Sequence, residues 1–477
     1  MMTTRYDSPL VTRYATAPMA AVFAPLTRAR RWRELWLVLL RNQRRLGLDI
    51  PAAAEEELAQ HLDDIDLAAV ATYEKELRHD VMAHVHALGD VAPTARPFLH
   101  LGATSCYVTD NGDVMALREA LDLVLPKLAG GIRQLADFAS TYAELPTLGF
   151  THFQAAQPTT VGKRASLWVA DLLDDLARLS QLRDGLRLRG AKGTTGTQAS
   201  YLALFDGDEA KVRQLDEAIA ADLDFPGVVP VTGQTYSRKV DHDLVSALGS
   251  LAMSLHKLGT DLRLLAHLKE VEEPFGRKQI GSSAMAYKRN PMRSERLCSL
   301  SRHVMSQTQN TAWTGATQWL ERTLDDSANR RLSLAEAFLA TDGCLEILLD
   351  VSAGLVVNPA VIRRRLAEEL PFMATEEILM AMVRAGADRQ TVHERIRVHS
   401  VAAATAVKRD GLANDLLERL AADEAFAPVH AELHALMQPE RFIGCAPSQV
   451  HRFVAEWVEP ALAPWADRLQ KGEGLRV

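Results

Sequence analysis

Residues 279–296, which read QIGSSAMAYKRNPMRSER, combine side chains that could abstract a proton. A serine hydroxyl, such as that of Ser282 or Ser283, is a weak base at neutral pH. Backbone N–H groups and a nearby ammonium, here that of Lys288, stabilise its alkoxide enough for the oxygen to accept a proton. We therefore expect this stretch to perform a serine-based proton abstraction.

The same residues concentrate positive charge around a predicted loop. Gly281 and the two serines favour a flexible loop, and Asn290-Pro291 indicates a turn before a helix that starts near Met292. An anion at this loop would meet several cations and the N–H groups of a helix N-terminus. The substrate is therefore expected to be an anion. The cations are Lys288, Arg289, Arg293 and Arg296.

This stretch resembles the signature GSSxMxxKxNP of the fumarase/aspartase superfamily, whose members eliminate fumarate from substituted succinates. Within the superfamily, it and residues 321–331 (ERTLDDSANRR) are most similar to the adenylosuccinate lyase family. The resemblance covers essentially the whole chain. Ala286 stands where the signature usually has proline, a departure that removes no group with a chemical role.

Residues 151–162 (THFQAAQPTTVG), between two predicted helices, contain a candidate acid. A lone histidine is more often a packed or surface residue than a catalyst. This stretch, however, resembles the second conserved segment of the superfamily, in which its histidine, here His152, is the general acid. Ala155 stands where the family often has proline, and the proline of this chain follows at Pro158.

The resemblance implies a β-elimination that needs no cofactor and acts on a succinyl-nucleotide. Ser282 would take the proton from carbon, Lys288 would stabilise the enediolate, and His152 would protonate the departing nitrogen. Ser283 is the alternative base, and only the resemblance separates the two serines.

Residues 102–113 (GATSCYVTDNGD) precede a helical pattern and contain a second candidate anion site. Their hydroxyls and backbone N–H groups could hold a carboxylate, although a plain helix cap explains the pattern equally well. The stretch resembles the first conserved segment of the superfamily, in which Thr104 and Ser105 grip the succinyl carboxylates.

Further substrate-binding residues follow from the resemblance. Ser327 and Arg331 are four apart and would share a helix face, so they could bind one phosphate together; the alternative is a capping serine and a salt-bridged arginine. The remaining residues that the resemblance assigns to substrate binding are Arg13, Tyr14, Arg78, His79, Asp80, Thr151, Gln234, Asn290, Glu295, Arg296 and Arg322.

Two other motifs do not support the chemistry they suggest. His79, His84 and His86 are spaced i, i+5 and i+7, without an acidic or cysteine ligand in a known pattern, so we expect no metal there. Residues 192–198 (KGTTGTQ) place their lysine before the glycines, opposite to a Walker loop, and are expected to form a turn between helices.

Bulk properties limit the class of protein. The chain has 477 residues, of which 47% are hydrophobic, and a net charge of −7. Its size allows several domains with ample core, and its charge argues against a nucleic-acid binder. The chain offers neither an apolar span for a membrane nor a paired-cysteine pattern, so we expect a cytoplasmic protein.

Apolar residues recur at steps of three and four over long stretches, which predicts long amphipathic helices. The clearest run extends over residues 240–265, and others cover 117–135 and 169–186. Such helices can bury their apolar faces only against one another. We therefore predict an all-α fold of three helical domains, with a long central helix bundle at residues 105–357 between helical domains at 1–104 and 358–477.

The candidate acid and base lie in distant segments of this bundle. In the superfamily each site is built from three subunits of a homotetramer, and we expect the same here.

Two alternatives remain at this point. Another fumarate-releasing lyase, such as argininosuccinate lyase or fumarase, would have no phosphate for Arg322, Ser327 and Arg331 to bind. A non-catalytic structural relative would not need His152, Ser282 and Lys288 together.

Overall fold

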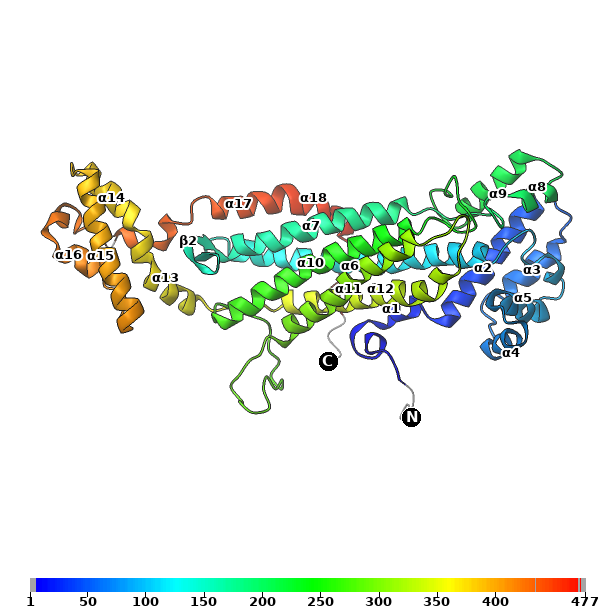
Figure 1. The fold of residues 1–477 in the computed structure, drawn as a ribbon, viewed down its shortest axis with the longest axis horizontal. Coiled ribbons are helices and arrows are strands. Elements are labelled where there is room, and N and C mark those ends of the chain that lie inside the picture. Colours follow the sequence, from blue (N-terminus) through cyan, green and yellow to red (C-terminus); the bar gives the residue numbers. More distant parts are fainter. Residues whose placement is uncertain (1–5, 434, 471, 473–477) are drawn as a thin grey trace.

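A computed structural model describes residues 6–433, 435–470 and 472. Helices form nearly all of its regular structure, and the molecule is long and narrow (Figure 1). Strands in these described residues form two small two-stranded sheets. The prediction of an all-α fold is therefore confirmed.

Five long helices form the central bundle: α6 (Cys106–Thr141), α7 (Val161–Gly185), α10 (Lys239–His267), α11 (Met292–Ala316) and α12 (Asp325–Ser352). Helix α10 packs against α11, α11 against α12, and α6 against α7. The 36-residue α6 is roughly 54 Å long and the 29-residue α10 roughly 44 Å, at about 1.5 Å per residue. The predicted long helices are thus present.

The apolar face of α10 explains why these helices associate. Its leucines recur at steps of three and four, which places them on one side of the helix. Those from Leu244 to Leu265 that continue this series are at most 4% exposed. Burying such a face removes apolar area from water, which stabilises the bundle.

One end of the bundle carries the N-terminal helices and an insertion between α7 and α10 (Figure 1). The N-terminus of α6 lies at this end. The elements here are α2 (Pro25–Arg45), α3 (Ala52–Gln60), α4 (Leu67–Leu77), α5 (Asp80–Val91), α8 (Ala199–Leu204) and α9 (Glu209–Asp222).

A buried ion cluster fixes the segment that begins the described chain, which contains η1 (Leu10–Tyr14) and α1 (Ala17–Val22). The Lys127 ammonium lies 2.6 Å from Asp342 Oδ1 and 2.8 Å from Glu346 Oε1. The other oxygen of Asp342 accepts hydrogen bonds from Thr16 N and Oγ1, at 2.6 and 2.8 Å. Thr16 is thereby tied to α6 and α12.

The opposite end carries a β-hairpin, a second two-stranded sheet and a group of shorter helices (Figure 1). The hairpin interrupts the predicted succession of helices. The elements are β1 (Pro146–Thr151) with β2 (Gln154–Thr160), β3 (Val271–Glu272) with β4 (Val356–Val357), and α13 (Pro359–Met373), α14 (Thr375–Arg384), α15 (Arg389–Asp410) and α16 (Leu416–Ala422).

The C-terminal part of the chain divides between two hydrophobic cores. Buried residues from Ala374 to Leu436 form a core of their own, whereas Val450, Val458 and Leu462 belong to the core of the bundle. The latter lie in α17 (Ala446–Phe453), η6 (Val454–Val458) and α18 (Glu459–Leu462). The domain limits given above remain a prediction, and this packing suggests a further boundary before α17.

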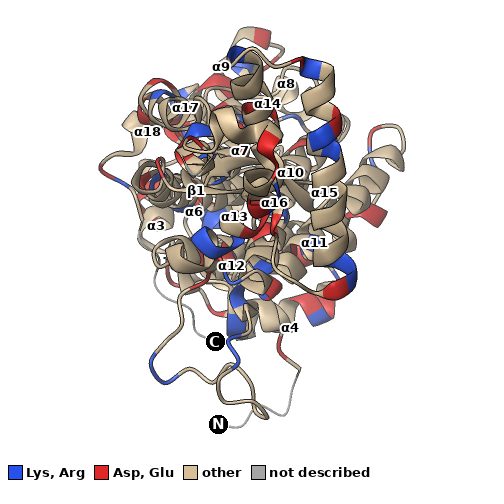
Figure 2. Cartoon of the chain, turned by 90° about the vertical axis from the view of Figure 1, so that its left-hand side faces the viewer, with Lys and Arg blue, Asp and Glu red and all other residues tan. Residues whose placement is uncertain are grey.

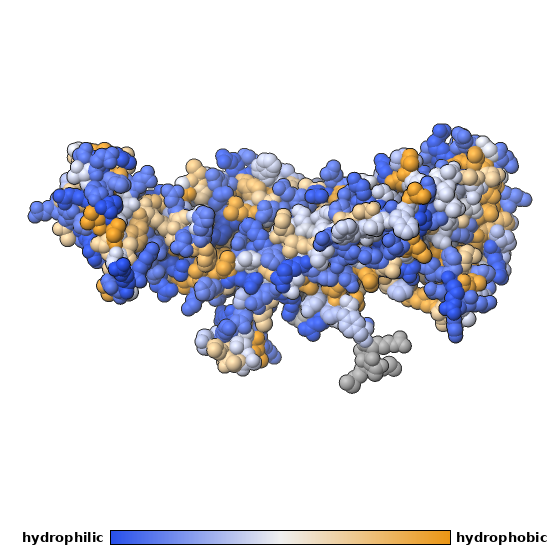
Figure 3. All heavy atoms as spheres, viewed as in Figure 1, coloured by the Kyte–Doolittle hydropathy of each residue, from blue (hydrophilic) through white to orange (hydrophobic). Residues whose placement is uncertain are grey.

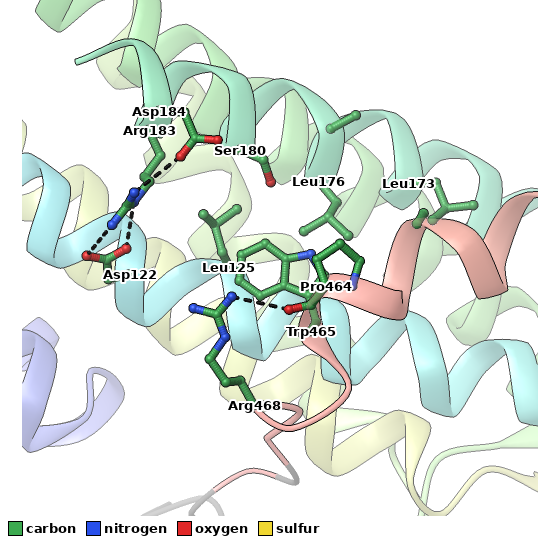
Figure 4. A pocket seen from close by; sticks show the side chains of 12 residues that line it. Asp122, Leu125, Leu173, Leu176, Ser180, Arg183, Asp184, Pro464, Trp465 and Arg468 are labelled. Atoms are coloured by element: carbon green, nitrogen blue, oxygen red, sulfur yellow. Dashed lines mark hydrogen bonds and ion pairs between the residues drawn. The ribbon is translucent and has the colours of Figure 1, made fainter. Parts of the chain in front are cut away.

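A groove of about 410 Å³ lies where these last helices return to α6 and α7 (Figure 4). Leu125, Leu173 and Leu176 line its apolar part. The Arg468 guanidinium lies over the Trp465 ring, 4.8 Å from the ring centre. None of the predicted site residues lines this groove.

In the part of the chain described, no helix is both long and apolar enough to cross a membrane.

Candidate active site

The candidate base lies on a loop that projects from the bundle between α10 and α11 (Figures 1 and 3). We call residues 273–291 the signature loop. Asn290 Nδ2 donates to the carbonyl of Gly281 at 2.8 Å, which joins the two arms of the loop. A Cβ at position 281 would overlap the carbonyl oxygen of Lys288, so only glycine allows this approach.

The two serines of the loop have different surroundings. Ser282 Oγ accepts hydrogen bonds from the backbone N–H groups of Ala284 and Met285, at 3.3 and 3.1 Å. Ser283 is exposed and has no such bond among the described residues. Amide donors favour the charged form of an oxygen that accepts from them, so this geometry favours an alkoxide at Ser282 over one at Ser283.

The N-terminus of α11 is occupied by a side chain of the protein itself. The Glu273 carboxylate, 6% exposed, accepts from the N–H groups of Arg293 and Ser294 at 3.0 and 2.9 Å. Arg293 also pairs with Asp350 at 2.8 Å. The expectation that an anionic substrate would meet this helix N-terminus is therefore wrong, because the Glu273 carboxylate already binds its N–H groups.

Other cations of the stretch remain on the surface. Lys288 is exposed, and so is Arg289, whose guanidinium lies 5.4 Å from the centre of the Phe275 ring. Figure 2 shows basic residues along the projecting loop. The Arg296 guanidinium lies 5.9 Å from the centre of the Tyr14 ring, so Tyr14, a predicted substrate-binding residue, reaches the first turns of α11.

The candidate acid lies at the tip of the hairpin. Thr151 pairs with Gln154, so His152 and Phe153 form a two-residue turn. Both have positive φ, 52° and 56°, as a type I′ turn requires, although such angles are unfavourable for a bulky side chain. Phe153 packs at 5.8 Å from Phe150 between ring centres, which supports the turn. His152 is exposed at the tip of this turn.

Glu270 anchors the base of the hairpin. Its carboxylate is 1% exposed and accepts a hydrogen bond from Thr147 Oγ1 at 3.4 Å. Arg365 Nε donates to the other oxygen at 3.0 Å. The base of the turn is thus held rigidly, although its tip is exposed.

A second set of predicted residues gathers at the N-terminus of α6. Ser105 Oγ lies 3.3 Å from His79 Nε2. Arg331 donates to Asp80 Oδ2 at 2.7 Å. Burial raises the pKa of Asp80, but the bonds from Arg331 and from the Val81 amide outweigh it and leave that pKa below its ordinary value. These contacts join α5, α6 and α12.

Gln234 and Arg322 complete this second set. The Sγ of Cys106, next to Ser105, lies 3.8 Å from Gln234 Oε1. Gln234 N donates to the carbonyl of Glu321 at 2.9 Å, and Arg322 pairs with Asp326 at 3.0 Å. Ser327 and Arg331 lie on α12, as predicted.

The predicted residues therefore form three separate groups in one chain. The loop group is Arg13, Tyr14, Ser282, Lys288, Asn290, Glu295 and Arg296. The hairpin group is Thr151 and His152. The α6-end group is Arg78, His79, Asp80, Thr104, Ser105, Gln234, Arg322, Ser327 and Arg331.

The lengths of two helices separate these groups. Helix α6 stands between the α6-end group and the hairpin group, and the 25-residue α11, roughly 38 Å long, stands between the loop group and Arg322. The hairpin and the signature loop leave the bundle at different places (Figure 1). A single chain does not assemble the three groups.

The other histidines of the α5 region have structural contacts. His84 is 7% exposed and packs edge-on against Trp32, with ring centres 5.0 Å apart. Burial, with the nearby Arg28 and Arg33, lowers the pKa of His84 to about 4. His86 stacks on Tyr73. The described residues contain no group of three His, Cys, Asp or Glu placed to hold a metal ion.

Sequence reasoning missed the residues that support the site. Glu273, Glu270 and Asp326 are acids beside loops, with no spacing that distinguishes them from surface residues. Their burial, at 6% exposed or less, is what reveals their function. Residues 192–198 do form a loop between α7 and α8, where Lys192 pairs with Asp216 at 2.6 Å.

Comparison with known families identifies similar proteins over the whole chain. Residues 43–306 match the family described as Lyase, and residues 371–453 match the family described as Adenylosuccinate lyase C-terminus. Adenylosuccinate lyase of Saccharomyces cerevisiae is 54% identical over 463 residues, and that of Schizosaccharomyces pombe 52%, each covering 96% of both chains. That of Schistosoma mansoni is 46% identical and covers 99% of both.

Solved structures show the same fold. The 3-carboxy-cis,cis-muconate lactonizing enzyme of Pseudomonas putida has a TM-score of 0.81 at 24% identity, and covers 97% of this chain and 100% of its own. A fumarate lyase of Mesorhizobium sp. BNC1 has a TM-score of 0.79 at 23% identity, covering 95% and 100%. These two similarities concern the fold alone.

Proposed function

The chain belongs to the adenylosuccinate lyase family of the fumarase/aspartase superfamily, and we propose that it uses Ser282 as general base and His152 as general acid in sites shared between subunits. Its activity is the elimination of fumarate from N6-succinyl-AMP, which leaves AMP, and from succinyl-aminoimidazole carboxamide ribotide in purine nucleotide biosynthesis. The full-length identity to curated adenylosuccinate lyases carries this assignment.

The proposed reaction breaks one C–H bond and one C–N bond. The Ser282 alkoxide takes a proton from the succinyl carbon that does not bear the nitrogen, which forms an O–H bond, and the electron pair of the broken C–H bond becomes the enediolate of the adjacent carboxylate. The Lys288 ammonium stabilises that charge. Collapse of the enediolate forms the C=C bond of fumarate while the C–N bond breaks, and His152 gives a proton to the departing nitrogen.

The hydrogen bonds at Ser282 support its role as base. Two backbone amides point at its Oγ, and none do so at Ser283 within the described structure. A donor that already points at the oxygen needs no rearrangement when negative charge develops there. This geometry agrees with the choice that the resemblance makes between the two serines.

The separation of the three groups supports shared sites. Since α6 alone holds Ser105 roughly 54 Å from the start of the hairpin segment, His152 has to act in a site whose carboxylate-binding residues come from another subunit. We propose a homotetramer, in which each site takes the loop, hairpin and α6-end groups from three different subunits.

The surface of the chain also supports association. Its accessible area is 23818 Å², whereas a compact monomer of this mass exposes roughly 17,600 Å². Large apolar side chains on three bundle helices are exposed, with Met253 at 60%, Trp313 at 64% and Leu332 at 63%. Such residues are typical of surfaces that partners cover.

The α6-end group fits both the phosphate and a succinyl carboxylate of the substrate. Arg322, Ser327 and Arg331 offer two guanidinium groups and a hydroxyl for a phosphate, and Thr104 and Ser105 offer hydroxyls for a carboxylate.

The four cysteines are unpaired, which supports a reducing compartment and hence the cytoplasm as the location.

The function is tested by supplying the purified protein with N6-succinyl-AMP and, separately, with the imidazole ribotide. We expect release of fumarate and the matching nucleotide from both substrates in equal amounts. AMP should inhibit competitively, because it occupies the phosphate-binding residues. If the protein fails to release fumarate from one of the two substrates, or from both, the proposal is contradicted.

A further inference from the structure

A buried guanidinium joins three elements of the α6 end. Arg238 is 3% exposed and precedes α10. Its Nη1 and Nη2 donate to the two carboxylate oxygens of Asp110 on α6, at 3.1 and 3.2 Å. Its Nε donates to Asp326 Oδ2 on α12, at 2.7 Å. One side chain thus bridges α6 and α12.

A second buried guanidinium extends the same network. Arg330, 8% exposed, donates from Nε to Asp241 Oδ2 and from Nη2 to the Tyr236 hydroxyl, at 2.7 and 2.6 Å. The Tyr236 hydroxyl donates to Asp241 Oδ1 at 2.6 Å, and the Tyr236 amide to Asp110 Oδ2 at 2.9 Å. Arg330 also pairs with Asp113 at 2.8 Å. The segment before α10 is thereby fixed to both helices.

The network residues alternate in sequence with the α6-end group. Asp110 lies on α6, five residues after Ser105. Tyr236 follows Gln234 by two. On α12, Asp326 directly precedes Ser327, and Arg330 directly precedes Arg331. Each of the three segments contributes at least one residue to the network and at least one other to the α6-end group.

Asp326 links the network directly to a predicted phosphate ligand. One of its oxygens accepts from Arg238 Nε, and the other accepts from Arg322 Nη1 at 3.0 Å. A carboxylate held on one side by a buried cation cannot turn, so it fixes the Arg322 side chain as well. The acid is 2% exposed and does not itself reach a substrate.

We infer that Arg238 is a positioning residue for the substrate-binding residues of the α6-end group: by bridging Asp110 and Asp326, it sets the places of Ser105, Gln234 and Arg322 relative to one another. The inference rests on the proposed function, because it assigns those three residues to the substrate. Arg238 touches no reacting atom.

The chemistry of the guanidinium explains why arginine is needed. Its planar fork binds both oxygens of Asp110 while Nε reaches Asp326 in another direction. A lysine keeps the charge, but its ammonium is a compact point charge without a planar fork of donors. It therefore cannot hold both carboxylates in one geometry. Arg238→Lys therefore removes the bridge without leaving the acids uncompensated.

The inference predicts a split between binding and chemistry. Ser282, Lys288 and His152 lie in the signature loop and the hairpin, which the network does not contact. Loss of the bridge should misplace the nucleotide but leave the acid and base in position. KM for N6-succinyl-AMP and the inhibition constant of AMP should each rise roughly ten-fold, and kcat should change less than about three-fold.

The experiment compares the wild-type tetramer, Arg238→Lys and Asp175→Asn. Asp175, 4% exposed on α7, accepts hydrogen bonds from Ser250 and Ser254, and serves as a buried acid outside both the network and the site. Thermal unfolding is measured for each protein beside KM, kcat and calorimetric binding of AMP. Asp175→Asn should lower Tm without raising KM. If Arg238→Lys does not fold, Asp326→Asn, which keeps the shape of the acid, replaces it.

The outcomes separate the inference from the proposed function. Fumarate release by the wild type tests the function alone. In active enzyme, weaker AMP binding and a raised KM in Arg238→Lys but not in Asp175→Asn support the positioning role. Unchanged KM and AMP affinity in a folded Arg238→Lys or Asp326→Asn enzyme overturn it, as does an equal rise in Asp175→Asn.

Discussion

Ser105 and His152 lie beyond opposite ends of the same helix, the 36-residue α6. Ser105 is the residue before its first turn, and His152 is the tip of the hairpin that follows its last. The relationship decides how a site can be built, because a residue that grips the substrate and a residue that protonates it have to be within a few ångströms of one molecule. If Ser105 grips the substrate and His152 protonates it, as we propose, one chain cannot supply both residues to the same site.

Replacing the candidate base should abolish the chemical step. We expect Ser282→Ala to lower kcat by about 10²–10⁴, the usual contribution of a general base, with little change in KM. Ser283→Ala is the matched control, since Ser283 lacks the two amide donors within the described structure, and it should retain most activity. Steady-state fumarate release measures both. A larger loss in Ser283→Ala would reverse the assignment.

A methyl group at position 281 should disable the signature loop. The Cβ of Gly281→Ala would overlap the carbonyl oxygen of Lys288, so the two arms of the loop would have to separate and carry Ser282 away from Lys288. We expect kcat to fall at least ten-fold with little change in Tm, because the loop is exposed.

Gly276→Ala provides the control in the same loop. There the nearest atoms to a new Cβ are those of Gln279, at 3.6 and 3.7 Å, which is ordinary contact. Activity of this variant should be near that of the wild type. Equal losses at both positions would mean that the loop tolerates no change in flexibility, rather than that one close approach matters.

The stability of the protein should fall with acid partly because of His100. Its Nδ1 accepts a hydrogen bond from Trp36 Nε1 at 2.9 Å, and burial lowers its pKa to about 4. An unfolded histidine has a pKa of about 6.5, so between these values the unfolded state binds more protons. The contribution of His100 to the free energy of unfolding is fully present above pH 6.5 and is lost as the pH falls to 4. The loss is at most roughly 3 kcal/mol.

His100→Asn should remove this part of the pH dependence. Asparagine does not titrate, its side-chain oxygen can accept from Trp36, and it tolerates the positive φ of 62° at this position. Urea unfolding at pH 7 and pH 5 measures the difference in free energy of unfolding. A pH dependence identical in the variant and the wild type would contradict the prediction.

Removing the buried ammonium of Lys127 should destabilise the fold. Lys127→Met removes a buried cation that pairs with the carboxylates of Asp342 and Glu346, which costs about 3–5 kcal/mol. Lys257→Met removes a lysine from an exposed pair with Asp261 and should cost about 0.5 kcal/mol or less. Thermal unfolding compares the two, and similar shifts in Tm would refute the distinction.

The long helices could be predicted from the sequence because their signal is redundant. The run over residues 240–265 repeats the helical spacing many times, and α10 extends from Lys239 to His267. The hairpin at residues 146–160 gave no such signal. Its turn is formed by His152 and Phe153, which lack the Asn-Gly or Asp-Gly pattern of type I′ turns. Its strands also do not alternate clearly between apolar and polar residues.

The candidate catalytic residues could be named from short motifs, but their geometry could not. The pattern GSSxMxxKxNP gives residue types and, by resemblance, the preference for Ser282, whereas the two amides that support this preference are placed only by the folded loop. The binding of Glu273 to the N-terminus of α11 was missed for the same reason. Contacts between distant segments depend on the three-dimensional packing, which no local spacing encodes.

The most direct test of the account is subunit exchange between two inactive variants. Ser282→Ala and His152→Ala proteins are mixed in equal amounts, exchanged under mild denaturation and assayed for fumarate release. If each site takes its base and its acid from different subunits, about one quarter of the sites regain both by random assortment, and activity should approach about a quarter of the wild-type value. If exchange of subunits is demonstrated and no activity returns, the shared site is contradicted.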